Sequence, residues 1–394
     1  MQGNTLLIAK NFYPHIGGVE SYITEFIKYY IKKRPDTFLY VICPAKEARL
    51  HDSISKTDKI IMATPKVNLT FMNLDKQTNI FLSAIQSLLY YYFILTRGIA
   101  LLSNKRSNIS YIYGIGGPFS ILPSLILSKI FNKKCFGHIH ADFRFAERSK
   151  LSKLFYKLIC SKLDRLFVNS KDALLDLLEI GINEEDVSII DNWVDTQLFK
   201  VKDRKTCREL LRLPLDKKIL LFVARLSEEK GVLEVLDCID ILKDREEFLF
   251  IIIGDGPLRP VVERRIKFNR NTLFLGPKRN FELVDYYNAA DLLLWGSLDV
   301  HYVSITVMEA LHCGLPVVSP STSTQGGKTG MEGFYIRQDT LPSRVGVLFK
   351  SDAKSLARAI DEIFNKKFDR EEIKRYALEK YSEKNADSVL MYLK

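Results

Sequence analysis

The strongest constraint on the fold is an alternation that runs through the whole 394-residue chain. Short, β-branched apolar runs alternate with longer amphipathic stretches, which is the pattern of βαβ units with a parallel sheet. In the first half the pattern predicts strands near Thr5–Ala9, Phe38–Ile42, Ser110–Tyr113, Phe136–His140 and Leu166–Asn169. In the second half it predicts strands near Ile219–Val223, Phe248–Ile253, Thr272–Leu275, Asp291–Leu294 and Pro316–Val318.

The polar stretch Lys200–Lys217 interrupts this alternation and predicts a domain boundary. We therefore expect two doubly wound α/β domains with Rossmann-like parallel sheets, residues 1–199 and 200–375. A C-terminal helix over 376–394 follows and is expected to pack back on the first domain. Ligands of such sheets bind at the carboxyl ends of the strands. Two facing domains predict an active site in the cleft between them.

Charge and cysteine content narrow the function classes. The formal net charge is +11, and residues 1–200 hold 26 Lys/Arg against 18 Asp/Glu. A phosphate-rich partner, either nucleic acid or an anionic membrane, is expected to meet the first half; a generally basic proteome is the alternative. The six cysteines show no zinc or disulfide spacing, which predicts reduced thiols and a cytoplasmic location.

Two segments of the first half favour the membrane alternative. Ile80–Thr96 has no charged residue for seventeen positions, but a spanning helix needs about 20 apolar residues. We expect it to be buried or to lie at an interface. Lys150, Lys153 and Lys157 repeat at helical spacing, which predicts a cationic helix face that meets anionic lipid. A solvated helix is the alternative.

Glycines follow two of the predicted strands. Gly17 and Gly18 come after the first strand, where paired glycines let backbone approach a ligand and a helix N-terminus favours phosphate. An ordinary βα turn is the alternative. Gly254 and Gly256 flank Asp255 after Phe248–Ile253; they allow a tight turn and close ligand approach, and Asp255 is expected to cap the next helix.

Charged side chains mark two further places in the second half. Arg225 and Lys230 lie on a short loop after the strand Ile219–Val223. Two cations there form a clamp for a diphosphate, with Arg binding in bidentate fashion and Lys as a point charge; a solvated charged loop is the alternative. Glu309 lies in the stretch His301–Gly314, on a helix that follows Asp291–Leu294. It can accept both hydroxyls of a ribose, or it can face solvent.

Seven strings in a fixed order carry a family resemblance. They are GGVE (17–20), VNSKDAL (168–174), IIDNWVDTQLF (189–199), VARLSEEKGV (223–232), GDGP (254–257), EALHCGLPVV (309–318) and GVLFKSDAKSLARAI (346–360). With them the chain resembles the retaining glycosyltransferases of the GT-B fold known as family 4, or glycosyl transferases group 1. The resemblance covers nearly the whole chain.

The resemblance implies a reaction and a site. A sugar would move with retention from a nucleotide-diphosphate donor to a glycan acceptor, without cofactor or divalent metal, because Arg225 and Lys230 neutralise the leaving diphosphate. Glu309 would hold the ribose. The catalytic residues would be His140, Arg225 and Lys230, with His140 and the weaker candidate His138 on the same side of one strand. Donor binding would involve Gly17, Gly18, Arg225, Lys230, Gly254, His301, Ser304, Ile305 and Glu309.

Two positions depart from the family pattern. The family carries two Glu residues eight positions apart, and Glu309 takes the second place. His301 stands at the first place, and Asp299 is the nearest carboxylate. Trp193 stands where the hinge region usually has Gly. These departures leave the identity of the donor sugar open.

The first domain is the acceptor side in this family, and it carries most of the positive charge. We therefore expect a peripheral membrane enzyme that extends a lipid-linked glycan at the cytoplasmic face. A GT-B-fold nucleotide-sugar epimerase or a sugar phosphorylase remains an alternative; the phosphorylase would need a pyridoxal-phosphate lysine. A nucleic-acid-binding protein would also explain the charge, but Lys150–Lys171 contains no known binding motif, and we expect no nucleic-acid partner.

Overall fold

The computed structural model describes residues 3–9, 18–44, 57–65, 80–140, 149–296, 303–321, 341–350 and 352–393. The chain divides into an N-terminal unit (residues 1–192 with 383–394) and a C-terminal unit (193–382). The division falls after Asn192, and not after Phe199 as the sequence predicts. Trp193 is fully buried, and the backbone N–H of Val194 donates to the carbonyl of Tyr381 (3.4 Å), so both residues pack with the C-terminal unit.

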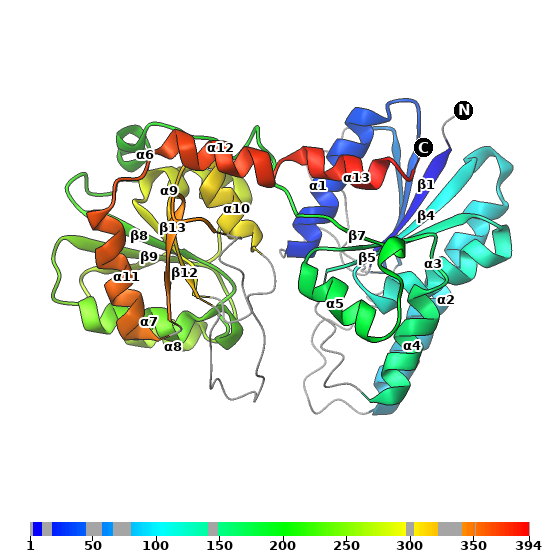
Figure 1. Ribbon diagram of the computed structural model, residues 1–394, viewed down its shortest axis with the longest axis horizontal. Coiled ribbons are helices and arrows are strands. Elements are labelled where there is room, and N and C mark those ends of the chain that lie inside the picture. Colours follow the sequence, from blue (N-terminus) through cyan, green and yellow to red (C-terminus); the bar gives the residue numbers. More distant parts are fainter. Residues whose placement is uncertain are drawn as a thin grey trace. The chain divides into compact units, whose positions relative to one another are not determined.

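Seven described strands form the sheet of the N-terminal unit, and all pairs are parallel (Figure 1). Their order is β3-β2-β1-β4-β5-β6-β7. The chain order reverses between β1 and β4, which is the topological switch point. The strands are β1 (Asn4–Ala9), β2 (Leu39–Ile42), β3 (Ile60–Ala63), β4 (Ile109–Ile115), β5 (Lys134–Ile139), β6 (Arg165–Val168) and β7 (Val187–Ile189).

Helices cover both faces of this sheet, because alternate strand residues point to opposite sides. Leu166 and Val168 of β6 join the cluster of α3, α4 and α5, whereas Phe167 between them packs against Tyr113 of β4 on the face of α1. The helix α2 packs on β2 and α3. The helices are α1 (Gly18–Lys33), α2 (Ile80–Ser103), α3 (Pro118–Phe131), α4 (Lys150–Cys160) and α5 (Lys171–Glu179).

The C-terminal unit repeats the architecture with six described parallel strands in the order β10-β9-β8-β11-β12-β13. Its switch point lies between β8 and β11. The strands are β8 (Lys218–Val223), β9 (Phe248–Ile253), β10 (Thr272–Phe274), β11 (Leu292–Leu294), β12 (Val317–Pro320) and β13 (Gly346–Phe349).

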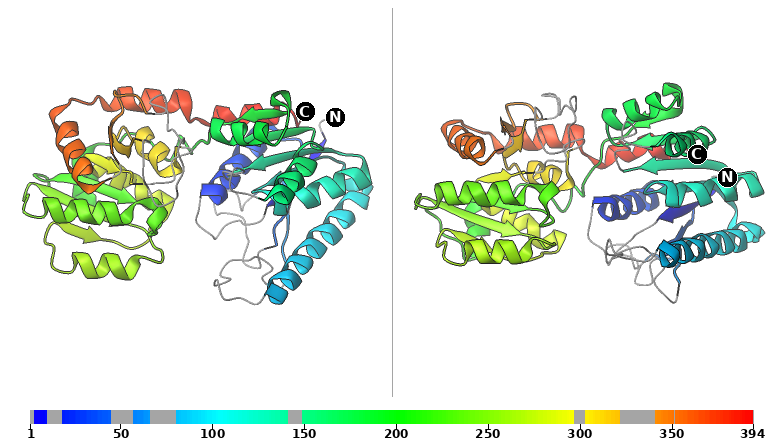
Figure 2. Two further views of the ribbon diagram at one scale, coloured as in Figure 1. Left: turned by 60° about the horizontal axis from the view of Figure 1, so that its bottom comes forward. Right: turned by 90° about the horizontal axis from the view of Figure 1, so that it is seen from below.

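Two separate apolar clusters hold helices on the two faces of this sheet. One joins the sheet to α9 (Asn280–Ala289), α10 (Ile305–His312) and α12 (Arg370–Lys380). The other joins it to α7 (Val232–Leu242), α8 (Arg259–Ile266) and α11 (Ala353–Asn365). Figure 2 shows the same layers from two further sides.

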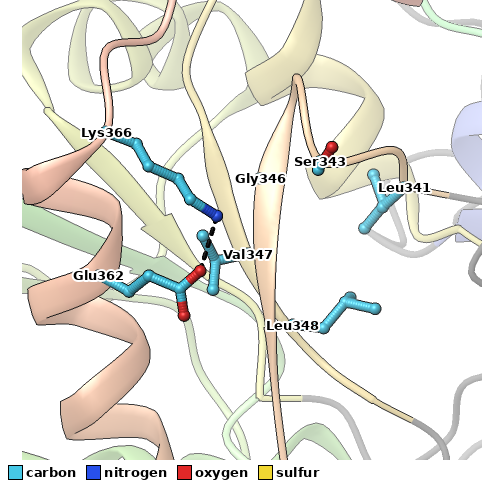
Figure 3. Close-up of a pocket in the computed structure, with 7 residues that line it drawn as sticks. All are labelled: Leu341, Ser343, Gly346, Val347, Leu348, Glu362 and Lys366. Atoms are coloured by element: carbon cyan, nitrogen blue, oxygen red, sulfur yellow. Dashed lines mark hydrogen bonds and ion pairs between the residues drawn. The ribbon is translucent and has the colours of Figure 1, made fainter.

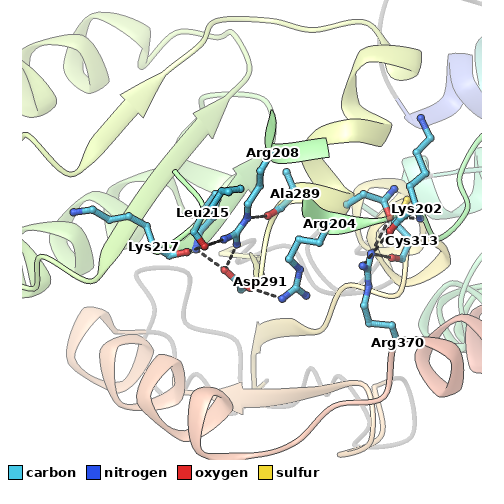
Figure 4. A network of polar contacts seen from close by, with 11 residues as sticks. Lys202, Arg204, Arg208, Leu215, Lys217, Ala289, Asp291, Cys313 and Arg370 are labelled. Atoms are coloured by element: carbon cyan, nitrogen blue, oxygen red, sulfur yellow. Dashed lines mark hydrogen bonds and ion pairs between the residues drawn. The ribbon is translucent and has the colours of Figure 1, made fainter. Parts of the chain in front are cut away.

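The polar stretch 200–217 is an ordered part of the C-terminal unit and contains α6 (Arg204–Leu210) (Figure 4). Arg208 is buried, and its guanidinium donates to Asp291 Oδ2 (2.6 Å) and to the carbonyls of Ala289, Leu215 and Lys217. Arg204 donates to the other oxygen of Asp291 (2.6 Å). Arg370 donates to the carbonyls of Lys202 and Cys313. Charged residues of the predicted domain boundary therefore form tertiary contacts within the C-terminal unit.

Residues 376–394 do not form the single helix that the sequence predicts. The helix α12 ends at Lys380, and the chain continues as η5 (Glu383–Ala386) and α13 (Asp387–Leu390). Tyr29 of α1 donates to Asp387 (2.8 Å), and the ring of Tyr392 packs against Phe167 at 5.7 Å between centroids. The last twelve residues thus belong to the N-terminal unit.

The three strands that the sequence analysis missed, β3, β7 and β13, are all edge strands. An edge strand has one neighbour and is short, so its apolar run is weak. The other strand ranges agree with the prediction to within a few residues.

Candidate active site

Loops from three strands meet at the carboxyl edge of the C-terminal sheet. They follow β8, β9 and β11, which includes the switch point of the sheet. The backbone N–H of Leu226 donates to the carbonyl of Asp255 (2.9 Å), and that of Leu258 donates to Leu226 (2.9 Å). These bonds fix the loop after β8 against the loop after β9.

Glycine allows this contact between loops. Gly231 has φ +68°, and a Cβ there would lie 1.8 Å from the carbonyl oxygen of Gly296, after β11. Gly254 has φ +146°, and a Cβ there would lie 1.9 Å from the carbonyl oxygen of Ala224. The sequence analysis explained Gly254 by close approach of a ligand. The structure instead shows close approach of a neighbouring loop, which fixes the backbone around Arg225 and Lys230.

Arg225 and Lys230 both lie on the loop after β8, where the sequence places them. Arg225 is exposed and Lys230 is half-buried. Between them, Ser227 Oγ donates to Glu229 (2.6 Å). Burial raises the pKa of Glu229, but this hydrogen bond and the cations Lys230 and Arg225 outweigh it and leave the pKa below its ordinary value. The loop therefore presents Arg225 and Lys230 at the carboxyl edge together with the ionised carboxylate of Glu229.

The helix α10 begins beside this edge, after β11. Ser304 is its N-cap, and its Oγ accepts the N–H of Val307 (3.3 Å). Ile305 is the first residue of the helix and is partly buried against the core. An N-terminal turn with free N–H groups favours an anion.

Glu309 is buried in α10 and is 3% exposed. Tyr287 of α9 donates to its Oε2 at 2.7 Å. Burial, followed by the Glu309 charge, raises the pKa of Tyr287 well above its ordinary value, so this phenol stays a donor. The solvent-facing alternative for Glu309 is thereby excluded.

Two further features differ from the expected site. Asp255 does not cap α8; its Oδ1 accepts the N–H of Gly256 (2.9 Å), and the N-cap of α8 is Leu258. A cavity of about 360 Å³ lies at β13 (Figure 3) and is lined by no residue that the sequence predicts for the site. Its lining includes Glu362 and Lys366, which form an ion pair at 2.6 Å.

In the N-terminal unit, the structure brings His138 and His140 together at the carboxyl end of β5. Their rings stack at 4.1 Å between centroids, as alternation along one strand requires. Tyr22 of α1 contacts both rings edge-on, at 4.8 Å and 4.4 Å. Sequence analysis had no means of placing Tyr22 here, because α1 reaches β5 only through the fold.

Hydrogen bonds extend from His138 across three strands. His138 Nδ1 lies 2.8 Å from Tyr113 Oη, and Nε2 lies 3.2 Å from Asn169 Oδ1. Tyr113 Oη in turn lies 3.3 Å from Tyr22 Oη, and Asn169 Nδ2 donates to Asn192 (2.7 Å). His138 is thus held on both ring nitrogens and has a structural role. His140 Nε2 has no partner among the described residues, which leaves His140 as the functional candidate.

Burial keeps both histidines neutral. It lowers the pKa of His140 to about 3. The pKa of His138 is well below its ordinary value, first because of burial and then because of the neighbouring His140. In a neutral imidazole one ring nitrogen donates a hydrogen bond and the other accepts one.

One pair of glycines beside a switch point escaped the sequence analysis. Gly116 and Gly117 follow β4 at the switch point of the N-terminal sheet, with φ of +103° and +98°. A Cβ on either would meet no atom within 4 Å, so the loop backbone is open. A Gly-Gly-Pro run after an apolar strand was the available signal.

Several predictions fall outside the described residues or are only partly described. Gly17, His301 and Asp299 lie outside them, and Gly18 is described as the first residue of α1. Within the described ranges no group of three or more His, Cys, Asp or Glu side chains could hold a metal ion.

Part of the chain matches a known protein family. Residues 203–380 match the family described as "Glycosyl transferases group 1". The chain is 28% identical over 186 residues to D-inositol 3-phosphate glycosyltransferase 2 of Catenulispora acidiphila. The matched segment covers 42% of this chain and 43% of that protein. The match thus spans less than half of the curated relative's length.

Solved structures extend the similarity to the whole fold. A glycosyltransferase from Rickettsia africae is similar with a TM-score of 0.74 at 18% identity, covering 100% of this chain and 98% of that one. Anabaena Alr3699/HepE in complex with UDP and glucose gives 0.69 at 17% identity, covering 99% and 98%. The two parallel-sheet units therefore have the GT-B fold, and the resemblance to the group 1 glycosyltransferases is confirmed.

Proposed function

We propose that this protein transfers a sugar, with retention of configuration, from a nucleotide-diphosphate donor to a glycan acceptor. The observation that carries the proposal is the pair Arg225 and Lys230, held at the carboxyl edge of the C-terminal sheet by loops that only glycine permits. This edge lies within the part of the chain that matches the group 1 family. A similar fold binds UDP and glucose in Alr3699/HepE.

Each group of the C-terminal unit has a part in the proposed reaction. As the glycosidic bond to phosphate breaks, negative charge develops on the leaving diphosphate. Arg225 and Lys230 stabilise this charge, and preorganised donors of this kind are the largest single contribution in many enzymes. The N-terminus of α10, with Ser304 as its cap, adds backbone N–H groups. Glu309 accepts the ribose hydroxyls while Tyr287 holds its other oxygen in place.

The N-terminal unit is proposed to act on the sugar and the acceptor. Neutral His140 would hydrogen-bond a hydroxyl of the transferred sugar, and His138 holds it through ring stacking. The open backbone at Gly116 and Gly117 is suited to a second polar ligand. We propose no divalent metal and no cofactor, since the two cations take the charge of the diphosphate.

The acceptor is proposed to be a lipid-linked glycan at the cytoplasmic face of a membrane, which makes the enzyme a peripheral membrane protein. The excess of positive charge in the first 200 residues supports an anionic membrane as partner. No binding motif supports a nucleic acid.

A thermal-shift screen of UDP, GDP and ADP sugars tests the donor class. A ligand at 100 times its Kd should stabilise the fold by about 2.7 kcal/mol. The anomeric configuration of the product, read by NMR with the stabilising donor, then separates retaining transfer from epimerisation of the free donor. Absence of any shift with all three classes would refute the proposal.

A further inference from the structure

Three neighbouring helices of the N-terminal unit carry positive charge and no negative charge. α2 packs on α3, and α3 packs on α4. Together they contain Arg97, Lys129, Lys150, Lys153 and Lys157 but no Asp or Glu. Soluble protein surfaces usually intersperse both signs. A face with cations alone is complementary to a partner that carries many anions.

α4 turns an apolar stripe outward. Leu151, Leu154, Phe155 and Leu158 are spaced i, i+3, i+4 and i+7, so they share one helix face, and all four are exposed. Leu151 is 78% exposed. The C-terminal end of the helix is anchored by Ile159 and Cys160, which are buried. Packing within the unit therefore buries some apolar side chains of α4. The outward stripe has no partner among the described residues.

Lysines border this stripe. Lys150 and Lys157 are exposed. Lys153 is half-buried and forms an ion pair with Glu179 of α5 (2.7 Å). The cationic face that the sequence predicts is thus reduced to two exposed lysines. The apolar stripe, which the sequence analysis missed, becomes the main feature of α4.

α2 has the same construction. Its outward side chains are Ile85, Leu88, Leu89, Tyr92 and Ile99, and all are exposed. Its inward side chains Tyr90 and Ile94 are fully buried. Among the described residues, Ile85–Ser103 forms the one helix that is long and apolar enough to cross a membrane by length and composition. Because its inward side packs on α3 and the sheet, it is better suited to lie along a surface.

We propose that the outward stripes of α2 and α4, here called the α2–α4 surface, dock on a lipid bilayer that contains anionic headgroups. The leucines enter the boundary between headgroups and acyl chains, and Lys150 and Lys157 meet lipid phosphates. The purpose of this docking, access to a lipid-linked acceptor, rests on the proposed function. Self-association through the same surface is the competing outcome, and the tests below separate it from lipid docking.

Vesicle flotation tests the apolar part of the surface. The full chain should float with phosphatidylcholine–phosphatidylglycerol vesicles. L151Q/L154Q/L158Q removes the α4 stripe with residues of similar helix propensity, and the partition coefficient should fall by at least about a hundredfold. The matched control L210Q/F268Q/L378Q removes three exposed apolar side chains from the C-terminal unit, and it should float like the wild type.

Charge is tested in the same assay. K150Q/K157Q should weaken flotation about fivefold per lysine at low salt, and less at high salt. Replacing phosphatidylglycerol by phosphatidylcholine alone should weaken the wild type to a similar extent. Equal binding to neutral vesicles would overturn the anionic part of the proposal.

A fluorescent reporter locates the contact. Both tryptophans of the chain, Trp193 and Trp295, are buried in the C-terminal unit. An F155W variant therefore adds the only exposed indole on the α2–α4 surface. Brominated lipid should quench it, while wild-type emission stays unchanged.

Three outcomes would overturn the proposal: unchanged flotation of L151Q/L154Q/L158Q, absence of quenching in F155W, or a wild-type dimer that the triple substitution dissociates and that does not bind vesicles. Donor binding is measured separately by thermal shift. A chain that floats but binds no nucleotide sugar would refute the proposed function and leave the docking intact.

Discussion

The two units share one architecture, but different kinds of contact hold the carboxyl edges of their sheets. In the C-terminal unit, backbone packs on backbone through Gly231 and Gly254, and charged side chains stand at the edge. In the N-terminal unit, aromatic and imidazole side chains pack on one another around His138, and the helices on one face expose apolar stripes.

The family match lies within the C-terminal unit, over residues 203–380. In that unit a contact between two backbones restricts the residue to glycine, whereas a contact between side chains, as in the N-terminal unit, admits many combinations.

Loss of either edge cation should have the largest effect. Arg225→Ala or Lys230→Ala removes a preorganised donor for the leaving diphosphate, and turnover should fall by about 10²–10³-fold. Steady-state kinetics with the donor found in the nucleotide screen measure it. Lys267→Ala, an exposed cation elsewhere in the same unit, is the control and should keep wild-type turnover. Normal turnover in both edge variants would show that the charged side chains at the C-terminal edge do not stabilise the leaving diphosphate.

The second prediction concerns the glycine contact. Gly231→Ala should destabilise the C-terminal unit by about 2–4 kcal/mol, because strain at positive φ adds to the displacement of a neighbouring backbone. Gly276 has nearly the same φ, +64°, with open space around its Cβ position. Gly276→Ala should therefore cost only about 1–2 kcal/mol. Urea unfolding followed by tryptophan fluorescence compares them, and equal costs would contradict the loop-packing explanation.

Donor affinity should respond to Glu309. Glu309→Gln keeps the size of the side chain but removes the charge that accepts the ribose hydroxyls. Hydrogen bonds to charged groups contribute about 1.5–3 kcal/mol, so we expect affinity to fall by about ten- to a hundredfold in calorimetric titration. Tyr287→Phe leaves the carboxylate in place and should cost less. The opposite ranking would make Tyr287 the more important group.

Acid should unfold the N-terminal unit first. In the unfolded chain histidines titrate near pH 6.5, whereas the folded pKa is about 3 for His140 and well below ordinary for His138. Below pH 6.5 the unfolded chain thus binds more protons, and stability falls by up to about 1.4 kcal/mol per pH unit per histidine. The C-terminal unit has one such group among its described residues, His312, with a pKa of about 4.

Tryptophan fluorescence reports only the C-terminal unit, so it separates the two transitions. At pH 5 the far-UV circular dichroism transition in urea should begin before the fluorescence transition, and at pH 7 the two should lie closer together. Coincident transitions at both values would show that the units do not differ in proton linkage.

Metal removal should have the smallest effect. Transfer is expected to survive excess EDTA, because Arg225 and Lys230 take the charge of the diphosphate. Loss of activity that Mg²⁺ or Mn²⁺ restores would show that the edge cations do not suffice.

Much of the C-terminal edge could be predicted from the sequence. Arg225, Lys230, Ser304 and Glu309 lie near strand ends or helix starts, and these positions follow from local periodicity. The reason for the glycines could not be predicted, because Gly231 and Gly296 are 65 positions apart and meet only through the sheet order. The contacts of His138 could not be predicted for the same reason, because its partners come from distant parts of the chain.

The sequence by itself determined the fold class, the succession of strands and helices, and the side of the strand that His138 and His140 share, since these depend on spacing along the chain. The tertiary structure decided three other matters. It assigned the polar stretch 200–217 to the C-terminal unit, divided residues 376–394 between the two units, and turned the leucines of α4 outward. Amphipathic spacing shows that a helix has an apolar face, but only packing against neighbours decides whether that face is buried.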